Sequence, residues 1–149
     1  MPKTTSNRKI SGSIKQIHMI AAIGRRGQIG LGGEMPWRNA ADLGWFKETT
    51  AGSAVIIGRR TLEHMPTLIG REVFSFDSTM EPDALIAHAS SGPYRNQPIF
   101  IAGGAYVYRA FAPFVNGLRL INHIDYDGEA DAWFPFDAYG IPQLSGNKT

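Results

Sequence analysis

Short, continuously apolar runs are spread along the chain and are separated by segments with mixed polar and apolar positions. Each run is too short for a buried helix and is bounded by glycine, proline or polar residues, which is typical of strands buried in a sheet. This pattern predicts strands at residues 17–24, 53–58 and 98–102, and two less apolar stretches predict further strands at 72–77, where the signal is weaker, and at 117–125. A glycine-rich stretch after the first run, residues 24–39, predicts a mobile loop.

The segments between these strands have the start signals of helices. Asn39 stands as an N-cap before one of them, and Pro82 stands in the first turn of another. We expect helices at residues 40–50, 59–65, 82–89 and 105–112. Strands that alternate with helices predict an α/β fold, with a mostly parallel central sheet that carries helices on both faces.

A chain of 149 residues fits one domain. We expect that domain to span residues 16–137, after a basic, flexible extension over residues 1–15 and before a polar tail over residues 138–149. Ligands of such sheets usually bind at the carboxyl ends of the strands. We therefore expect the site to be built from the residues directly after 17–24, 53–58 and 98–102.

Composition excludes several kinds of protein. The chain has no cysteine, which rules out disulfides and thiol chemistry and suits the reducing cytoplasm where we expect it. The apolar runs are far shorter than the ~20 residues of a membrane span. Basic residues are not interleaved with aromatic ones, so we expect no nucleic-acid partner. The 4 histidines lack metal-ligand spacing, and the acidic run at residues 125–131 lacks the features of a calcium loop, so we expect no metal and a solvated loop.

Two arginines come directly after the apolar run at residues 53–58. Arg59 and Arg60 stand in the first turn of a helix, where the helix dipole makes a cation unfavourable by up to ~1 kcal/mol. An anion held by backbone N–H groups, both guanidinium groups and the Thr61 hydroxyl would explain them. The alternative is that both arginines simply point to water.

Two glycines, Gly103 and Gly104, separate the apolar run at residues 98–102 from the next helix. Glycine allows the backbone to approach a ligand closely, although it also makes ordinary tight turns, and a full G-x-G-x-x-G motif is absent. Together with the arginine junction, this gives two close-approach turns at strand ends. Two such turns point to a dinucleotide, because a single phosphate group would explain only one of them.

A single acid stands among apolar residues after the glycine-rich loop. Asp42, at the third position of its helix, has an ordinary role available in the field of the helix dipole. Its neighbours Leu43, Trp45 and Phe46 indicate partial burial, and a buried carboxylate is unfavourable unless it is paired. Such an acid suits recognition of two N–H groups on a flat heterocycle, and also proton supply near neutral pH.

These motifs, in this order and spacing, resemble the dihydrofolate reductase family. The matching segments, from about residue 17 to residue 135, are IHMIAAIG, IG-x-x-x-x-MPW, AADLGWFKETT, VIIGRRT, AGGAYVY, HID and D-x-W-F-P. The resemblance implies an NADPH-dependent oxidoreductase that reduces 7,8-dihydrofolate to 5,6,7,8-tetrahydrofolate, by hydride transfer to C6 and protonation at N5. It further implies a place in one-carbon and thymidylate metabolism, and inhibition by antifolates.

The resemblance also assigns roles to residues. It makes Asp42, Trp37 and Tyr108 catalytic: Asp42 binds the pterin and promotes protonation, Trp37 belongs with Met35 to a mobile lid, and Tyr108 lies beside the nicotinamide. It implies that Arg71 pairs with the glutamate carboxylate of the substrate. The other substrate-binding residues that it implies, beside Asp42, are Ile20, Ala22, Leu43, Phe46, Met65, Leu68, Ala102 and Asn122.

The cofactor site that the resemblance implies runs over three parts of the chain. Arg59 would read the 2′-phosphate, assisted by Ser78, and the peptide between Gly103 and Gly104 would be cis. The full implied set is Ala22, Ile29, Gly30, Gly58, Arg59, Arg60, Thr61, Ser78, Gly103, Gly104, Ala105, Tyr106, Val107 and Tyr108.

The chain departs from the family's pattern at a few positions. Asn122 stands where the family has a threonine that binds the acid, Ala102 replaces a bulkier aliphatic residue, and Asp77 lies near the adenosine end, where an acid repels a 2′-phosphate. The family also continues past Pro135 with two antiparallel strands that are missing here. We therefore expect an uncovered sheet edge, reduced stability, and oligomerisation through that edge.

Two other functions stay open at this point. One is a reductase of the same fold that acts on another pterin or on a pyrimidine intermediate. The other is a catalytically weak folate- or nucleotide-binding protein, or a structural one, which the short C-terminal part, Asn122 and Ala102 would suit.

Overall fold

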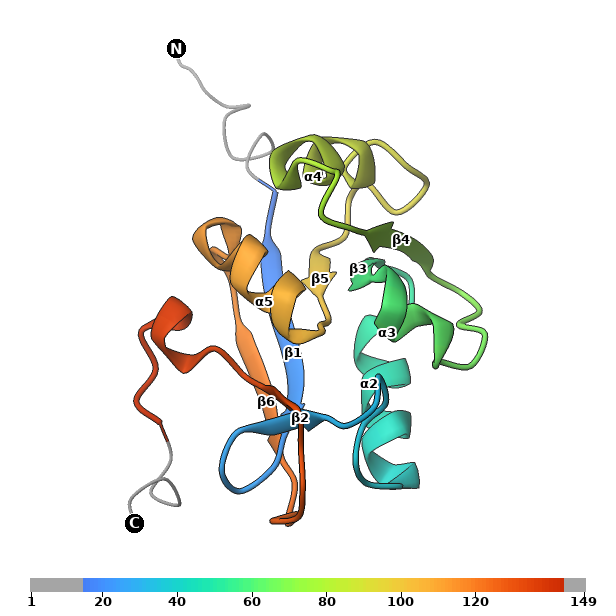
Figure 1. The fold of residues 1–149 in the computed structure, drawn as a ribbon. Coiled ribbons are helices and arrows are strands. Elements are labelled where there is room, and N and C mark those ends of the chain that lie inside the picture. Colours follow the sequence, from blue (N-terminus) through green and yellow to red (C-terminus); the bar gives the residue numbers. More distant parts are fainter. Residues whose placement is uncertain (1–14, 144–149) are drawn as a thin grey trace.

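A computed structural model of the chain describes residues 15–143. It has a parallel sheet of five strands with helices against both faces (Figure 1), which confirms the predicted α/β fold. The spatial order is β4-β3-β5-β1-β6. The strands are β1 (Ile17–Ile23), β3 (Ala54–Gly58), β4 (Glu72–Phe76), β5 (Ile99–Ile101) and β6 (Arg119–His123).

The predicted helices are all present, with ends that shift by a residue or two. They are α2 (Ala40–Thr50), α3 (Arg59–Glu63), α4 (Pro82–Ala89) and α5 (Ala105–Phe111), and two 3₁₀ turns, η1 (Ala112–Phe114) and η2 (Phe136–Tyr139), come later in the chain. Helix α2 begins as predicted, because the Asn39 side chain accepts a hydrogen bond from the Asp42 amide at 2.9 Å. That cap fixes Asp42 in the first turn.

Both faces of the sheet are covered, which explains why the inner strands β3 and β5 have no polar side chains. Along β1, Met19 and Ala21 point to the face packed by α4, α5 and η2, whereas Ile20 points to the face packed by Trp45 and Phe46 of α2. The period of two along a strand alternates side chains between these two clusters.

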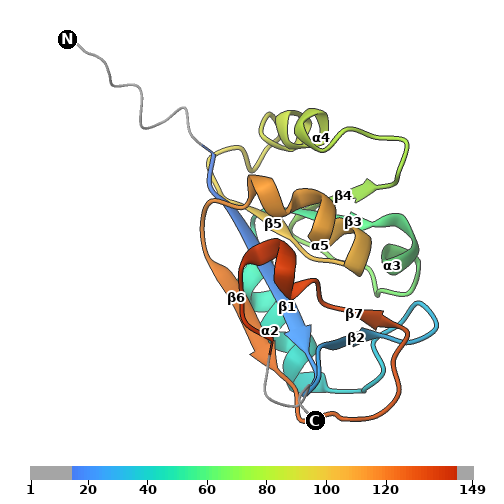
Figure 2. The same ribbon diagram turned by 60° about the vertical axis from the view of Figure 1, so that its left-hand side comes forward.

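A small second sheet was not predicted. Strand β2 (Gln28–Gly30) lies inside the glycine-rich stretch and pairs antiparallel with β7 (Ala132–Trp133), as Figure 2 shows. Gln28 is fully buried, and its amide accepts from Arg26 N at 2.7 Å and donates to Gly128 O at 3.1 Å. A local pattern cannot show this strand, because its partner lies about a hundred residues away.

The acidic run that was expected to be a solvated loop is exposed but paired. Arg25 binds Asp125 at 2.6 Å and Arg26 binds Asp127 at 2.5 Å. These ion pairs join the loop after β6 to the turn before β2. Exposed pairs of this kind contribute little to the free energy of unfolding, so their main effect is to orient the loop.

The packed part of the chain extends beyond residue 137, where we expected the domain to end. Tyr139, expected in a polar tail, is 4% exposed, stacks on Phe134, and donates a hydrogen bond to Tyr108 O at 2.6 Å. Its position in the core shows that the packed part reaches past residue 137. The extension expected over residues 1–15 lies outside the described residues apart from Lys15, and so do residues 144–149 of the expected tail.

Strand β6 forms one edge of the sheet, and within residues 15–143 no strand pairs with its outer side. That this edge is uncovered in the whole protein, and that the chain oligomerises through it, both stay predictions. In the same residues no helix is long and apolar enough to cross a membrane. No group of three or more potential metal ligands occurs among them either.

Candidate active site

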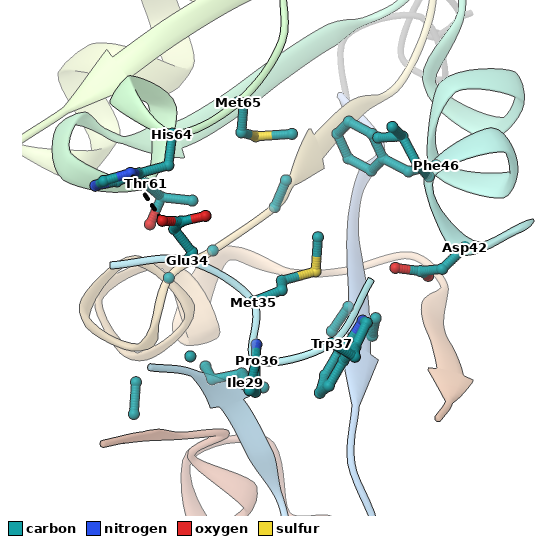
Figure 3. A pocket seen from close by; sticks show the side chains of 18 of the residues that line it. Ile29, Glu34, Met35, Pro36, Trp37, Asp42, Phe46, Thr61, His64 and Met65 are labelled. Carbon is teal, nitrogen blue, oxygen red and sulfur yellow. Dashed lines mark ion pairs between the residues drawn. The ribbon is translucent and has the colours of Figure 1, made fainter. Parts of the chain in front are cut away.

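A cavity of about 710 Å³ opens at the carboxyl ends of β1, β3 and β5, where the fold class places ligands. Its size is that of a site for a cofactor or a small molecule. Helix α2 forms one wall, residues 61–66 form another, and residues 29–39 close it from the side (Figure 3). The predicted site residues that line it are Ile20, Ala22, Ile29, Gly30, Trp37, Asp42, Leu43, Phe46, Thr61, Met65, Ala102, Gly103, Gly104, Ala105 and Tyr108.

Asp42 is the one buried acid of this cavity within the described residues; its side chain points inward (Figure 3) and it is 4% exposed. Asn122 donates from Nδ2 to Asp42 Oδ1 at 2.8 Å. Asn122 reaches it because β6 pairs with β1, which places Asn122 opposite Ala22. Among the described residues nothing donates to Asp42 Oδ2, so one oxygen of a buried carboxylate is free to accept from a ligand.

Trp37 adds a second unsatisfied group. Its Nε1 is buried and has no hydrogen-bond partner within residues 15–143, while its ring packs at 5.5 Å from that of Tyr126. A buried donor without a partner is unfavourable by about 1–3 kcal/mol. Trp37 and Asp42 both line the cavity (Figure 3), so each offers a polar group that a ligand could satisfy.

Tyr108 supplies a neutral aromatic wall. Its hydroxyl donates to Ile20 O at 2.8 Å, and the ring is buried. Burial raises the pKa of Tyr108 far above its usual range, and Tyr139 and the charge of Asp42 add to the shift. The hydroxyl therefore stays protonated near neutral pH, and Tyr108 cannot serve there as a base.

The two glycines after β5 form a cradle of bare backbone. The Gly103–Gly104 peptide is cis, as the resemblance implied, and Gly103 has φ +100°. A Cβ on Gly103 would lie 3.1 Å from the Tyr108 ring, and one on Gly104 would lie 3.1 Å from Thr61 Oγ1. Side chains here would fill the cavity, so the chain keeps a surface that an extended flat group can approach.

A model of the dihydrofolate reductase family matches residues 16–140. The chain belongs to this family. It is therefore an oxidoreductase. Asp42, Trp37, Gly103 and Gly104 all line the one cavity described above, while the roles that the resemblance assigns to them stay predictions.

Individual relatives agree with the family assignment. The chain is 33% identical to a dihydrofolate reductase of Buchnera aphidicola over 127 residues, 80% of this chain and 78% of that protein. It is also 33% identical to a dihydrofolate reductase of Neisseria meningitidis over 129 residues, covering 80% and 79% of the two proteins. A dihydromethanopterin reductase of Methylorubrum extorquens is 31% identical over 126 residues, 79% of this chain and 89% of that protein.

Several residues that the resemblance assigned to the site do not line the cavity. Arg59, Arg60 and Ser78 are exposed beyond it, at the ends of β3 and β4. Gly58 lies behind the cradle, where its amide donates to Gly103 O at 2.7 Å. The Val107 side chain lies in the core, so only its backbone could face a ligand.

Arg71 is held against the end of helix α2. Its Nη1 donates to Lys47 O and Thr50 Oγ1, both at 2.9 Å, while Nε and Nη2 donate to Ile69 O at 3.1 and 2.7 Å. Of its five N–H groups, one on Nη2 is left for a ligand. The neighbouring Leu68 packs into the apolar cluster on the α2 face.

Sequence reasoning missed a contact between a glutamate and a histidine at the cavity. Glu34, in the glycine-rich segment, lies with Oε2 3.9 Å from Nδ1 of His64, the residue just after α3 (Figure 3). Both residues line the cavity. Glu34 stands at an unspecified position of the segment IG-x-x-x-x-MPW, and His64 stands in none of the quoted segments, so only the fold brings them together.

Proposed function

We propose that this member of the dihydrofolate reductase family reduces 7,8-dihydrofolate to 5,6,7,8-tetrahydrofolate with NADPH, in support of one-carbon and thymidylate metabolism. The observation that carries the proposal is Asp42, a carboxylate that is buried in the cavity and has one oxygen free of hydrogen bonds within the described residues. A reduced pterin offers the two adjacent N–H donors that such a group binds best.

The reaction adds one hydride and one proton across a carbon–nitrogen double bond. NADPH, when bound, supplies the hydride to C6 of the substrate and leaves in its oxidised form. The chain's own part is to align the substrate, exclude water, and deliver the proton to N5.

Asp42 is the group that orients the pterin and promotes that protonation. Its carboxylate accepts from the ring N–H and the 2-amino group, while Asn122 holds the other side of the carboxylate. The unsatisfied Trp37 Nε1 is a donor that can hold a water near the pterin edge. Ile20, Phe46 and Met65 supply the apolar walls for the ring system.

The cavity also fits the cofactor. The nicotinamide has room beside Tyr108, whose ring is flat, neutral and fixed by its bond to Ile20 O. The cradle of Gly103 and Gly104, with Thr61 beside it, leaves backbone open to the next part of the cofactor. Arg59 and Arg60, which are exposed directly after β3, are the cations that we propose for its phosphates.

A second candidate is reduction of a different dihydropterin, one without a glutamate tail. Arg71, the expected carboxylate ligand, already uses four of its N–H groups within the protein, which limits it to a single further hydrogen bond. One relative that covers most of this chain is named a dihydromethanopterin reductase. The same turnover assay, run with several substrates, separates the two candidates.

The test measures the absorbance of NADPH with dihydrofolate, for the wild type, for Asp42→Asn, and for Glu129→Gln as a control that removes an exposed charge elsewhere. We expect Asp42→Asn to lower kcat/KM by at least about 100-fold at neutral pH. Activity should recover partly at low pH, where the substrate arrives already protonated. Glu129→Gln should match the wild type.

Other outcomes distinguish the alternatives. Equal rates for the wild type and Asp42→Asn would refute the role of the acid. Faster turnover of a dihydropterin without the glutamate tail would favour the second candidate. Tight binding of an antifolate without any NADPH oxidation would leave a binding protein instead of an enzyme.

A further inference from the structure

An acid and a base lie side by side at the end of the sheet beyond the cavity. Strands β3 and β4 run parallel with Gly58 opposite Phe76, so the next residues, Arg59 and Asp77, are neighbours at the carboxyl edge. Arg59 is the residue that the family resemblance assigns to a 2′-phosphate. The resemblance assigns no binding role to Asp77. Its negative charge repels a phosphate, which binds to positive groups.

Asp77 is held in place by its own turn. Its Oδ1 accepts from Thr79 N at 2.9 Å and from Thr79 Oγ1 at 2.5 Å, and its carbonyl accepts from Met80 N at 3.1 Å. The hydrogen bonds from Thr79 lower the pKa of Asp77, and the nearby charge of Arg59 lowers it further, so the carboxylate is ionised at neutral pH. Its Oδ2 accepts no hydrogen bond from the described residues, which leaves one oxygen for a ligand.

An aromatic surface stands next to this carboxylate. Tyr106, at the start of α5, is 58% exposed and stacks on Phe76 with ring centroids 6.1 Å apart. Phe76 is the residue immediately before Asp77. A nucleoside that packs its base on the exposed Tyr106 ring would therefore bring its ribose toward Asp77 and Arg59.

The two forms of a nicotinamide dinucleotide differ at this ribose. A free 2′-hydroxyl donates a hydrogen bond to a carboxylate, which is how acids at such strand ends bind NADH. A 2′-phosphate has no donor to offer at neutral pH and is repelled by the same carboxylate. Arg59 and Arg60 favour the phosphate, so Asp77 offsets part of the preference that they create.

We propose that Asp77 sets the dinucleotide preference of this site, so that it accepts NADH at a strength close to that for NADPH, with the free ribose hydroxyl bound to Asp77. This inference rests on the proposed function, because it assumes a dinucleotide in the cavity. It adds that the enzyme does not depend on the phosphorylated cofactor.

Direct binding tests the inference without turnover. Calorimetric titrations compare NADH with NADPH, and 5′-AMP with 2′,5′-ADP, on the wild type and on Asp77→Asn. The asparagine keeps the side-chain oxygen that accepts from Thr79 and removes only the charge. Glu129→Gln is the matched control, because it removes one acid near β6, at the opposite edge of the sheet from β4.

We expect the wild-type affinities for NADH and NADPH to lie within about tenfold of each other. Asp77→Asn should shift the ratio toward 2′,5′-ADP over 5′-AMP by about fivefold, the scale of one partly exposed charge near a phosphate. Glu129→Gln should leave the ratio as it is.

Two results would overturn the inference, and they differ in what they do to the proposed function. If both dinucleotides bind and the wild type favours NADPH by more than about 100-fold, or Asp77→Asn leaves the ratio unchanged, the inference fails and the proposed function stands. If neither dinucleotide binds to the wild type, both fail together.

Discussion

The two ends of the proposed site, a substrate end at Asp42 and an adenosine end at Arg59, are built in opposite ways. At the substrate end one carboxylate, Asp42, is buried and has a neutral amide as its partner. At the adenosine end Arg59, Asp77 and Ser78 meet solvent, and charges of both signs lie together. Electrostatic interactions are strong where water is excluded and weak where it is not. We therefore expect a single contact to decide ligand recognition at the buried end, and several weaker contacts to share recognition at the exposed end.

The largest effect is expected where the two ends meet, at the glycine cradle. Gly103→Ala forces a side chain into φ +100° and places its Cβ 3.1 Å from the Tyr108 ring. Strain and overpacking together should lower the free energy of unfolding by about 2–4 kcal/mol. Chemical denaturation, monitored by fluorescence, measures the loss.

Gly52→Ala is the matched control for this change. Gly52 also has a positive φ, +71°, but nothing lies within 4 Å of its Cβ position. It should show the backbone strain alone, about 1–2 kcal/mol, and leave cofactor affinity unchanged. If both variants lost the same free energy of unfolding, the short distance between the Gly103 Cβ position and the Tyr108 ring would not contribute to the effect.

An intermediate effect is expected at the buried end. Asn122→Leu keeps the size of the side chain and removes the donor to Asp42, leaving a buried carboxylate oxygen without a partner. We expect a loss of about 1–3 kcal/mol in the free energy of unfolding. The affinity for 5′-AMP should not change, because the adenosine end does not use Asn122.

Asn122→Thr provides the comparison for that variant, since a hydroxyl can donate to the same oxygen. It should recover most of the stability that Asn122→Leu loses. The value of kcat/KM should likewise be highest for the wild type, lower for Asn122→Thr and lowest for Asn122→Leu. A leucine variant as stable and as active as the wild type would show that the contact at 2.8 Å is incidental.

The same contrast explains what could be predicted from the sequence. Asn39 and Asp42 obey local rules of helix capping, and Gly103 marks a backbone position that side chains would block, so all three could be found from sequence alone. Parallel strands buried on both faces are recognisable by their apolar runs. The main framework of the site is thus encoded in short segments.

What could not be predicted depends on partners far along the chain. Gln28 is polar in sequence yet fully buried, because β2 pairs with a strand about a hundred residues later. Tyr139 was expected in a polar tail, but its hydroxyl donates a hydrogen bond to Tyr108 O. Glu34 and His64 meet only through the fold. No local periodicity carries this information.

The smallest expected effect concerns salt, and it compares the two ends in one experiment. Raising the ionic strength from about 0.1 M to about 1 M shortens the screening length from about 10 Å to about 3 Å. Affinity for 2′,5′-ADP should fall about two- to threefold, because it depends on exposed Arg59 and Arg60. At saturating cofactor, kcat should hardly change, because Asp42 and Asn122 are shielded from the added ions.

Arg60→Gln should reduce the salt dependence of 2′,5′-ADP binding without affecting kcat. If kcat at saturation instead fell as steeply as the nucleotide affinity, the carboxylate at the substrate end would be open to water, and the contrast between the two ends would fail.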